Sequence, residues 1–241
     1  MLNKIIRLIG KEKGPTSIIL VGVHGNERCG IEALHNILPK IKIENGVVYF
    51  GYGNPRAILQ NKRFTEANLN RMFKIDSLLS GADKKSYEYS RARFLKKYLN
   101  KSDALLDIHA SFVKNSKPFV ICESNAKRIT KYLPIKLLVS GFNRVEPGGT
   151  DYYMNKKGKI GICIECGYIA DPNSIKLAER AILSFLKTQG HIAGNKRLTK
   201  QVHIIMKTIY LTRTDRFVIK KHFKNFETVS KGQIIGHDGG K

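Results

Sequence analysis

Strand-like and helix-like segments alternate along most of this chain, and that alternation constrains its fold more than any other feature. Short apolar runs that favour buried strands occupy residues 17–23, 46–52, 104–108, 119–122 and 160–165. Apolar residues at the three- and four-residue spacing of helices lie between several of these runs. We therefore expect an α/β fold in which helices sandwich a mostly parallel or mixed sheet.

The clearest helix signal follows Asp171, a good N-cap residue, because Pro172 comes next and favours the first helical position. Its apolar residues recur at helical spacing: Ile175, Ala178, Ile182 and Phe185. This helix is expected to end near Gly190. A second helix is predicted over residues 85–99, and the polar stretch before it, residues 76–86, is predicted to be a surface loop.

The pattern changes after Gly190, because helical spacing disappears and short alternating runs take its place. These runs, which favour strands, lie at residues 202–206, 208–211, 217–219 and 234–235. The sequence therefore predicts two domains, an α/β domain over residues 1–194 and a small β-rich domain over residues 195–241.

The chain is strongly basic, with 43 Lys and Arg residues against 19 Asp and Glu residues, a formal net charge of +24. Such a surplus attracts anions of any kind, from nucleic acids to acidic metabolites. The sequence shows neither zinc-finger spacing, nor a basic arm, nor the aromatic-rich signature of RNA-binding modules. A small anionic substrate is therefore a better expected partner than nucleic acid.

The sequence offers no support for a membrane or secreted protein. The longest apolar runs, such as residues 18–21, fall far short of the roughly 18 residues that span a bilayer. The first ten residues lack the apolar core and cleavage site of a secretory signal. Four cysteines are too few for a disulfide scaffold, and Cys163 and Cys166 would point to opposite faces of one strand. We expect a cytoplasmic protein with reduced thiols.

Four residues with metal-binding or acid–base side chains come at the ends of predicted strands. His24 and Glu27 follow the first strand, His109 ends the third, and Glu165 ends the fifth. Because ligands bind at the carboxyl ends of parallel strands, these side chains are expected to meet there. Two imidazoles and one carboxylate form the donor set of a catalytic zinc site. The sequence thus predicts zinc on His24, Glu27 and His109, with Glu165 as general base.

Each of these signals alone has an ordinary explanation. A solvated loop histidine beside a helix-capping glutamate would give the same pattern at residues 24–27. Asp107 either orients a ligand from behind or faces a helix. Cys29 is the only other nearby donor, and we expect it to pack in the following helix. If Glu165 is not the base, Asp107 or Asp151 would carry the proton.

Three polar residues between the first two ligand segments suit the recognition of an anion. Arg63 could supply positive charge to the oxyanion that develops during attack on a carbonyl. Asn70 and Arg71 offer an amide and a planar fork of donors, which suits a carboxylate. The alternative for Arg71 is an internal ion pair that braces its loop.

Together these motifs resemble the succinylglutamate desuccinylase/aspartoacylase family, which is related to the zinc carboxypeptidases. They occur in the family's order and span residues 17–190. The matching motifs are His24-Gly-Asn-Glu27, Asn54-Pro-Arg-Ala57, Arg63-Phe64, Leu69-Asn70-Arg71, Asp107-Ile-His109 and Glu165-Cys-Gly167. The resemblance implies one zinc ion per chain on His24, Glu27 and His109, and Glu165 as the general base.

The resemblance also implies Arg63 at the substrate carbonyl oxygen and Asn70 with Arg71 on a substrate carboxylate. The chain departs from the family pattern at Asn68, where many relatives carry an aspartate. Before the base, the family carries a tyrosine and an arginine that hold substrate, and residues 148–157 show no matching arginine. Four residues there could substitute for it: Tyr152, Tyr153, Lys156 and Lys157.

The predicted function is that of a zinc-dependent hydrolase, with the deacylase chemistry in residues 1–194. Its substrate would be a small carboxylate-bearing compound, such as an N-acyl amino acid, cleaved at an amide or ester bond. One alternative is a zinc exopeptidase that acts on short peptides. Another is a basic binding protein that keeps this fold without catalysis.

Overall fold

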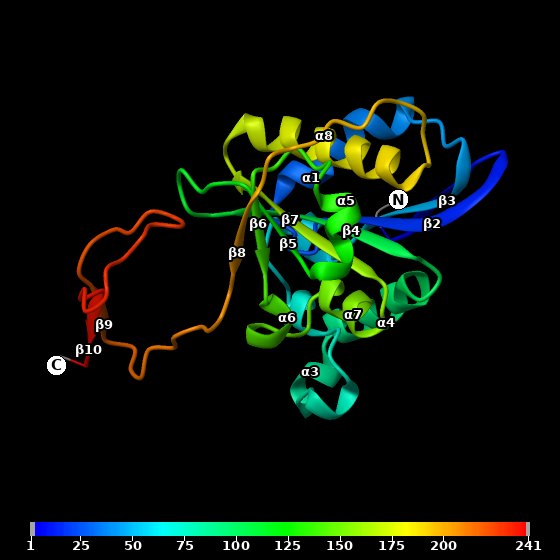
Figure 1. Ribbon diagram of the computed structural model, residues 1–241. Helices are drawn as coiled ribbons and strands as arrows, with labels where there is room; N and C mark the ends of the chain where they lie inside the picture. The colour runs from blue at the N-terminus through cyan, green and yellow to red at the C-terminus, as the bar shows by residue number, and fades with distance from the viewer. Residues whose placement is uncertain (1–2, 240–241) are drawn as a thin grey trace.

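A mixed sheet of eight strands forms the centre of the computed structural model, which describes residues 3–239 (Figure 1). The strand order is β1-β3-β2-β4-β7-β5-β6-β8. These strands are β1 Ile5–Ile9, β2 Glu12–Val21, β3 Asn45–Tyr52, β4 Ala104–Ser111, β5 Phe119–Cys122, β6 Leu137–Ser140, β7 Ile160–Tyr168 and β8 Val202–Ile205. The neighbours β3, β2, β4 and β7 are parallel, whereas β1 pairs antiparallel with β3 and β5 antiparallel with β7. The predicted α/β fold with a mixed sheet is confirmed.

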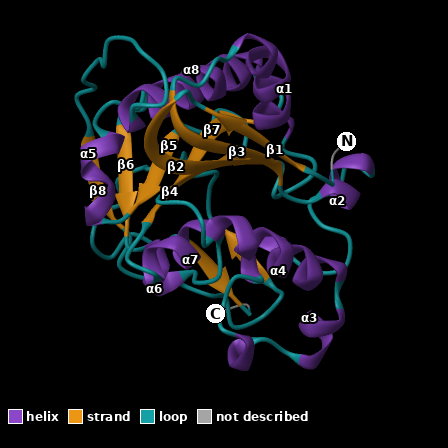
Figure 2. Ribbon diagram, turned by 90° about the vertical axis from the view of Figure 1, so that its right-hand side faces the viewer, coloured by secondary structure: helices purple, strands orange, loops and turns teal. Residues whose placement is uncertain are grey.

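Helices cover both faces of this sheet (Figure 2). The α-helices are α1 Arg28–Ile37, α2 Pro55–Leu59, α3 Gly81–Lys85, α4 Tyr87–Leu99, α5 Lys127–Thr130, α6 Phe142–Val145, α7 Thr150–Lys156 and α8 Pro172–Gln189. The 3₁₀ helices are η1 Leu38–Lys40, η2 Leu69–Arg71, η3 Asp76–Leu78 and η4 Ser124–Ala126. Along β2, Ile19 and Val21 pack in the core beneath α1 and α8, whereas Ile18 and Leu20 pack beneath α4 and α7. Because successive side chains point to opposite faces, a strand covered on both sides is a continuous apolar run.

The helix predicted after Asp171 is α8, and its ends are where the sequence placed them. The Asp171 side chain accepts a hydrogen bond from the backbone N–H of Asn173, Pro172 is the first helical residue, and Gly190 is the C-cap. The helix predicted over residues 85–99 is α4, which begins two residues later.

The prediction of a loop over residues 76–86 is wrong. That stretch lies on the surface, but it contains η3 and α3. A reciprocal capping box holds the start of α3: the Ser80 hydroxyl accepts from the backbone of Asp83, and the Asp83 carboxylate accepts from the backbone of Ser80. Such a box satisfies two N–H groups that a short helix otherwise leaves open.

The C-terminal segment forms fewer strands than its apolar runs predicted. Two short strands, β9 Phe217–Ile219 and β10 Gly236–Asp238, pair antiparallel in a separate small sheet. Residues 208–211 and 234–235 are not strands, although the carbonyl oxygen of Ile235 accepts from the backbone N–H of Lys220 at 2.9 Å. Tyr210 and Leu211 remain 75% and 79% exposed. In Figure 1 this segment extends away from the sheet.

Two features link this segment to the larger part. β8 pairs in parallel with β6 and so extends the large sheet, although it follows the proposed boundary at residue 195. The ring of Phe226 lies 5.2 Å from that of Phe119 on β5. Division into domains 1–194 and 195–241 stays a prediction.

The four cysteines are free and buried. Cys166 packs in the core with α1 and α8, whereas Cys163 lines a pocket on the other face, as expected for residues three apart on a strand. Cys29 lies in the same core as Cys166. Among residues 3–239, none of the helices has the length and apolar character needed to cross a membrane. A cytoplasmic location stays a prediction.

Candidate metal centre and active site

The turn that follows β2 carries His24 and Glu27, and close packing fixes its shape. A side chain at Gly25 would place its Cβ 2.1 Å from the carbonyl carbon of Ala57, so only glycine fits between this turn and α2. The Gly25 N–H donates to the carbonyl oxygen of Arg63 at 3.3 Å. The turn is therefore held between α2 and the chain at residue 63.

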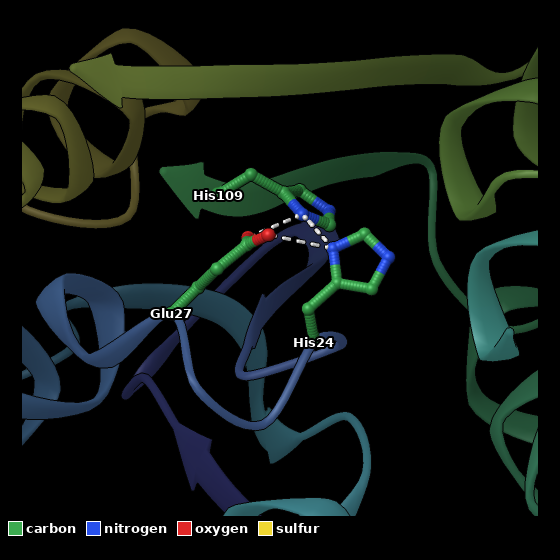
Figure 3. A group of neighbouring side chains, drawn as sticks. All are labelled: His24, Glu27 and His109. Carbon is green, nitrogen blue, oxygen red and sulfur yellow. Dashed lines mark hydrogen bonds and ion pairs between the residues drawn. The ribbon is translucent and has the colours of Figure 1, made fainter. Parts of the chain in front are cut away.

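Three buried donor groups converge beside this turn (Figure 3). Nδ1 of His24 lies 2.8 Å from Oε1 of Glu27, and Nδ1 of His109 lies 2.9 Å from Oε2 of the same carboxylate. The two Nδ1 atoms are 3.2 Å apart. Donors about 2.0–2.1 Å from a tetrahedral zinc ion stand roughly 3.3 Å from one another, so the cluster is close to the spacing that such an ion needs.

The outer nitrogens of both imidazoles face acceptors, which leaves the Nδ1 lone pairs for a cation. Nε2 of His24 lies 3.1 Å from Oδ1 of Asn68. Many relatives carry an aspartate at this position, so in this chain a neutral amide takes the place of a carboxylate beside His24. Nε2 of His109 lies 3.2 Å from Oδ2 of Asp107, an ion-pair contact without hydrogen-bond alignment. Asp107 thus sits where a carboxylate orients a ligating histidine.

The electrostatics of the cluster favour a bound cation. Burial alone would raise the pKa of Glu27, but His109 and His24 outweigh it and hold that pKa well below its usual range. Burial lowers the pKa of His24. For His109 burial acts in the same direction, but Asp107, Cys163 and Glu27 raise its pKa well above 6.5. The site attracts positive charge, which either a proton or a metal ion can supply, and the donors fit zinc.

Glu165 stands opposite His109 in the register of β7 with β4. Its Oε2 atom is buried and has no hydrogen-bond partner among the described residues. Burial raises the pKa of Glu165 to about 7, the negative charge of Glu27 adds to the rise, and His109 and Arg63 oppose it. A carboxyl group with a pKa near neutrality suits general acid–base work.

Arg63 reaches the cluster from the loop that follows α2. Its Nη1 donates to Oε1 of Glu27 at 3.0 Å, and its side chain, which is 44% exposed, lines the pocket. Arg63 therefore touches both a proposed zinc ligand and the space where a substrate would lie.

Glu88 anchors that loop, and sequence reasoning missed it because it lies within a predicted helix. Its buried carboxylate accepts from Nδ2 of Asn54 at 3.0 Å, and from the backbone N–H and hydroxyl of Thr65 at 2.8 and 2.7 Å. It also accepts from the backbone N–H groups of Glu66 and Ala67. Burial would raise the pKa of Glu88, but these bonds lower it. The backbone at residues 65–67, between Arg63 and Asn70, is thus held by one carboxylate.

Arg71 is held by acceptors of the chain itself. Its Nη2 lies 2.5 Å from Oε1 of Glu146, and its Nη1 donates to the carbonyl oxygen of Asn70 at 2.8 Å. The internal ion pair considered from the sequence is present. Glu146 is a further residue that sequence reasoning missed, since nothing in the sequence relates position 146 to position 71.

These residues surround one pocket of about 120 Å³. Of the predicted site residues, six line it and Glu27 lies behind them; the six are His24, Arg63, Asn70, Arg71, His109 and Glu165. Tyr152 and Asp151 also line it, and burial raises the pKa of Asp151 to about 6. Tyr153, Lys156 and Lys157 instead border a separate surface depression.

Comparison with known proteins identifies the family to which this fold and this site belong. The family model of the succinylglutamate desuccinylase/aspartoacylase catalytic domain matches residues 13–189. The chain belongs to the succinylglutamate desuccinylase/aspartoacylase family, as its motifs predicted.

Individual relatives match at lower similarity. An N-alpha-acetyl-L-2,4-diaminobutyric acid deacetylase of Halomonas elongata is 22% identical over 95% of this chain and 72% of its own length. A succinylglutamate desuccinylase of Pseudomonas aeruginosa is 33% identical over 67 residues, which span 26% of this chain and only 20% of that enzyme. The structure of a succinylglutamate desuccinylase from Vibrio cholerae superposes with a TM-score of 0.82 at 19% identity, covering 98% of this chain and 76% of that one. This structural match supports the fold.

Proposed function

We propose that this protein is a zinc-dependent hydrolase that cleaves the amide (or ester) bond of a small carboxylate-bearing substrate such as an N-acyl amino acid. One observation carries the proposal. Three buried donor atoms, contributed by His24, Glu27 and His109, lie within 4.8 Å of one another at the floor of a pocket that also contains Glu165. Family membership supports the same reaction class, since relatives are named as a deacetylase and a desuccinylase.

His24, Glu27 and His109 would hold the zinc ion. When bound, zinc supplies a Lewis acid that polarises a carbonyl group and lowers the pKa of a water molecule. Glu165 takes a proton from the attacking water and passes it to the leaving amine, because its carboxyl group titrates near neutrality and has a free oxygen. Arg63 stabilises the negative charge that develops on the carbonyl oxygen.

The size of the pocket favours a small substrate. A volume of about 120 Å³ is well below the roughly 300–1,000 Å³ of pockets for drug-sized ligands. Asn70 and Arg71 both line this space, and a substrate carboxylate is proposed to bind near them. Dipeptides belong in the substrate panel, because a zinc exopeptidase would hold the same groups.

The test is a metal assay combined with a substrate panel on the purified protein. We expect about one zinc ion per chain and release of a free amino acid from N-acyl substrates. Glu165→Gln should retain zinc while turnover falls by roughly 10²–10⁴-fold. Glu32→Gln, an exposed carboxylate paired with Arg28 on α1, is the matched control and should leave turnover unchanged. Absence of zinc, with no hydrolysis after zinc is added, would refute the proposal.

A further inference from the structure

Asp107, the carboxylate beside His109, is fully buried and accepts one hydrogen bond among residues 3–239. The hydroxyl of Thr150 donates that bond to Oδ2 at 2.5 Å, whereas Oδ1 has no hydrogen-bond partner in the described part of the chain. Nε2 of His109 lies 3.2 Å from the same Oδ2 atom, without hydrogen-bond alignment. One carboxylate oxygen therefore contacts both the hydroxyl and the imidazole.

The position of Asp107 on β4 explains why it meets His109 but not how its carboxylate is turned. Side chains two residues apart on a strand point to the same face, so Asp107 and His109 share a face with Leu105, which packs in the core beneath α4 and α7. The backbone of Asp107 is held on both sides, by β2 and by β7. The sheet leaves the carboxylate free to rotate about its side-chain bonds, so another contact has to set that rotation.

The first turn of α7 supplies this contact because it packs very closely on β7. Thr150 is the first residue of α7 and is fully buried. A Cβ at Gly161 of β7 would lie 2.3 Å from the carbonyl oxygen of Asp151, so only glycine allows the helix to start this close to the sheet. The N–H of Gly161 also donates to Oδ1 of Asn155 at 3.0 Å. Packing of the helix on the sheet thus places the Thr150 hydroxyl against Asp107.

The chemistry of the three groups gives the contact a direction. An ionised carboxylate only accepts hydrogen bonds, so the hydrogen of the Thr150 hydroxyl lies on the side of Asp107. The carboxylate keeps acceptor capacity for a hydrogen on Nε2 of His109. A proton on Nε2 leaves the lone pair of Nδ1 for a metal ion, and Nδ1 is the atom that faces Glu27. The orientation of Asp107 therefore bears on which nitrogen of His109 can act as a ligand.

We propose that Thr150 is a positioning residue of the zinc site, whose hydroxyl holds the Asp107 carboxylate against His109. The inference rests on the proposed function, because it adds a residue to the zinc site described there. Thr150 is not among the residues that line the pocket, so it acts through Asp107 rather than on substrate. Loss of a group that orients a metal-binding histidine usually weakens metal binding roughly ten- to hundredfold.

The test measures the zinc dissociation constant of each purified variant by competition with a chelator. Thr150→Val keeps the shape of the side chain and removes the hydroxyl, so it should weaken zinc binding roughly ten- to hundredfold. Thr150→Ser and Thr150→Ala differ by the hydroxyl alone; the serine variant should bind zinc more tightly, and this pair serves if Thr150→Val does not fold. Thr130→Val is the matched control, since it removes the hydroxyl of another buried threonine, on α5 and outside the pocket, and should leave zinc binding unchanged.

A double-mutant cycle asks whether Thr150 acts through Asp107. Thr150→Val should change the zinc dissociation constant much less in an Asp107→Ala background than in the wild type, because the acceptor of the hydroxyl is already absent. An equal effect in both backgrounds would overturn the inference. Chemical denaturation of the zinc-free proteins supplies the structural readout. If Thr150→Val lowers only the free energy of unfolding and keeps the wild-type zinc dissociation constant, Thr150 supports the fold and the inference is wrong.

The same measurements separate this inference from the proposed hydrolase. Weaker zinc binding in Thr150→Val, with no hydrolysis of any substrate by the wild type, would sustain the inference and refute the hydrolase. Unchanged zinc binding in Thr150→Val, with hydrolysis of N-acyl substrates by the wild type, would do the reverse. A wild-type protein that binds no zinc would overturn both.

Discussion

Buried histidines occur at both ends of the central sheet, and they differ in the charge of their partners. His191, beside the amino end of β3, is fully buried. Its Nδ1 lies 2.8 Å from the carbonyl oxygen of Asn45, and its Nε2 lies 2.8 Å from the hydroxyl of Ser17. A carbonyl oxygen only accepts, so Nδ1 donates to it and Nε2 accepts from the hydroxyl. Both ring nitrogens of this neutral imidazole are satisfied.

At the carboxyl end of the same sheet, His24 and His109 are as deeply buried, but they face carboxylates. Glu27 lies between their Nδ1 atoms, and Asp107 lies behind His109. Ionised carboxylates buried at this depth are costly unless positive charge accompanies them. Burial of a histidine thus does not distinguish a structural residue from a proposed metal ligand, whereas the charge of its partners does.

The largest effect is expected from a comparison of two single variants, each of which removes one histidine at one end of the sheet. His109→Ala should abolish zinc binding and turnover, because two donors remain where three are needed. His191→Ala should keep both, while the free energy of unfolding falls by about 1–3 kcal/mol because buried polar groups lose their partner. Metal analysis, turnover and chemical denaturation of the two variants check this. Loss of zinc in His191→Ala would remove the distinction between the two ends.

Glu88 sharpens the comparison, because it is a buried carboxylate at the same carboxyl end of the sheet. Its partners are N–H and O–H groups that donate hydrogen bonds, and none of them is a proposed zinc ligand. Glu88→Gln places an NH₂ group among N–H and O–H donors, which disturbs the loop that carries Arg63 and Asn70. We expect zinc to remain bound and kcat/KM to fall roughly ten- to hundredfold, the scale of a lost charged hydrogen bond. Separate kcat and KM values, with zinc content, test this. A variant that loses only stability, with kcat and KM unchanged, would limit Glu88 to a structural role.

The smallest effect concerns pH. Burial lowers the pKa of His191, so the unfolded chain takes up a proton near pH 6.5 while the folded chain does not. His191 therefore reduces the free energy of unfolding as pH falls below about 6.5, by at most roughly 1.4 kcal/mol per pH unit. His191→Gln should lose less stability than the wild type between pH 7.5 and 5.5. Denaturation curves at both pH values measure the difference, and an identical pH dependence would contradict the assignment.

The sequence predicted the fold and the grouping of the four site residues for the same reason. Continuous apolar runs specify buried strands, and polar residues directly after such runs must lie at the sheet edge. His24, Glu27, His109 and Glu165 all carry that signal, and the structure places them together. Their roles as zinc ligands and base stay predictions.

The residues that sequence reasoning missed depend on contacts between loops. Glu146 meets Arg71 only because the chain folds back over 75 positions, and no periodicity encodes that contact. Glu88 looks like any helical glutamate until the loop at Thr65 packs on it. The apolar run at residues 208–211 predicted a strand, but a strand needs a partner, which local sequence does not supply.

The tight fit at Gly25 has a consequence for mutational scanning. Substitution there forces backbone against backbone at α2, so variants at this position should be depleted whether a library is selected for activity or only for soluble expression. Arg71 and Glu146, which are partly exposed, should be depleted only in the selection for activity. Intolerance at position 25 therefore reports steric exclusion beside the site, and only the difference between the two selections identifies residues that act on substrate.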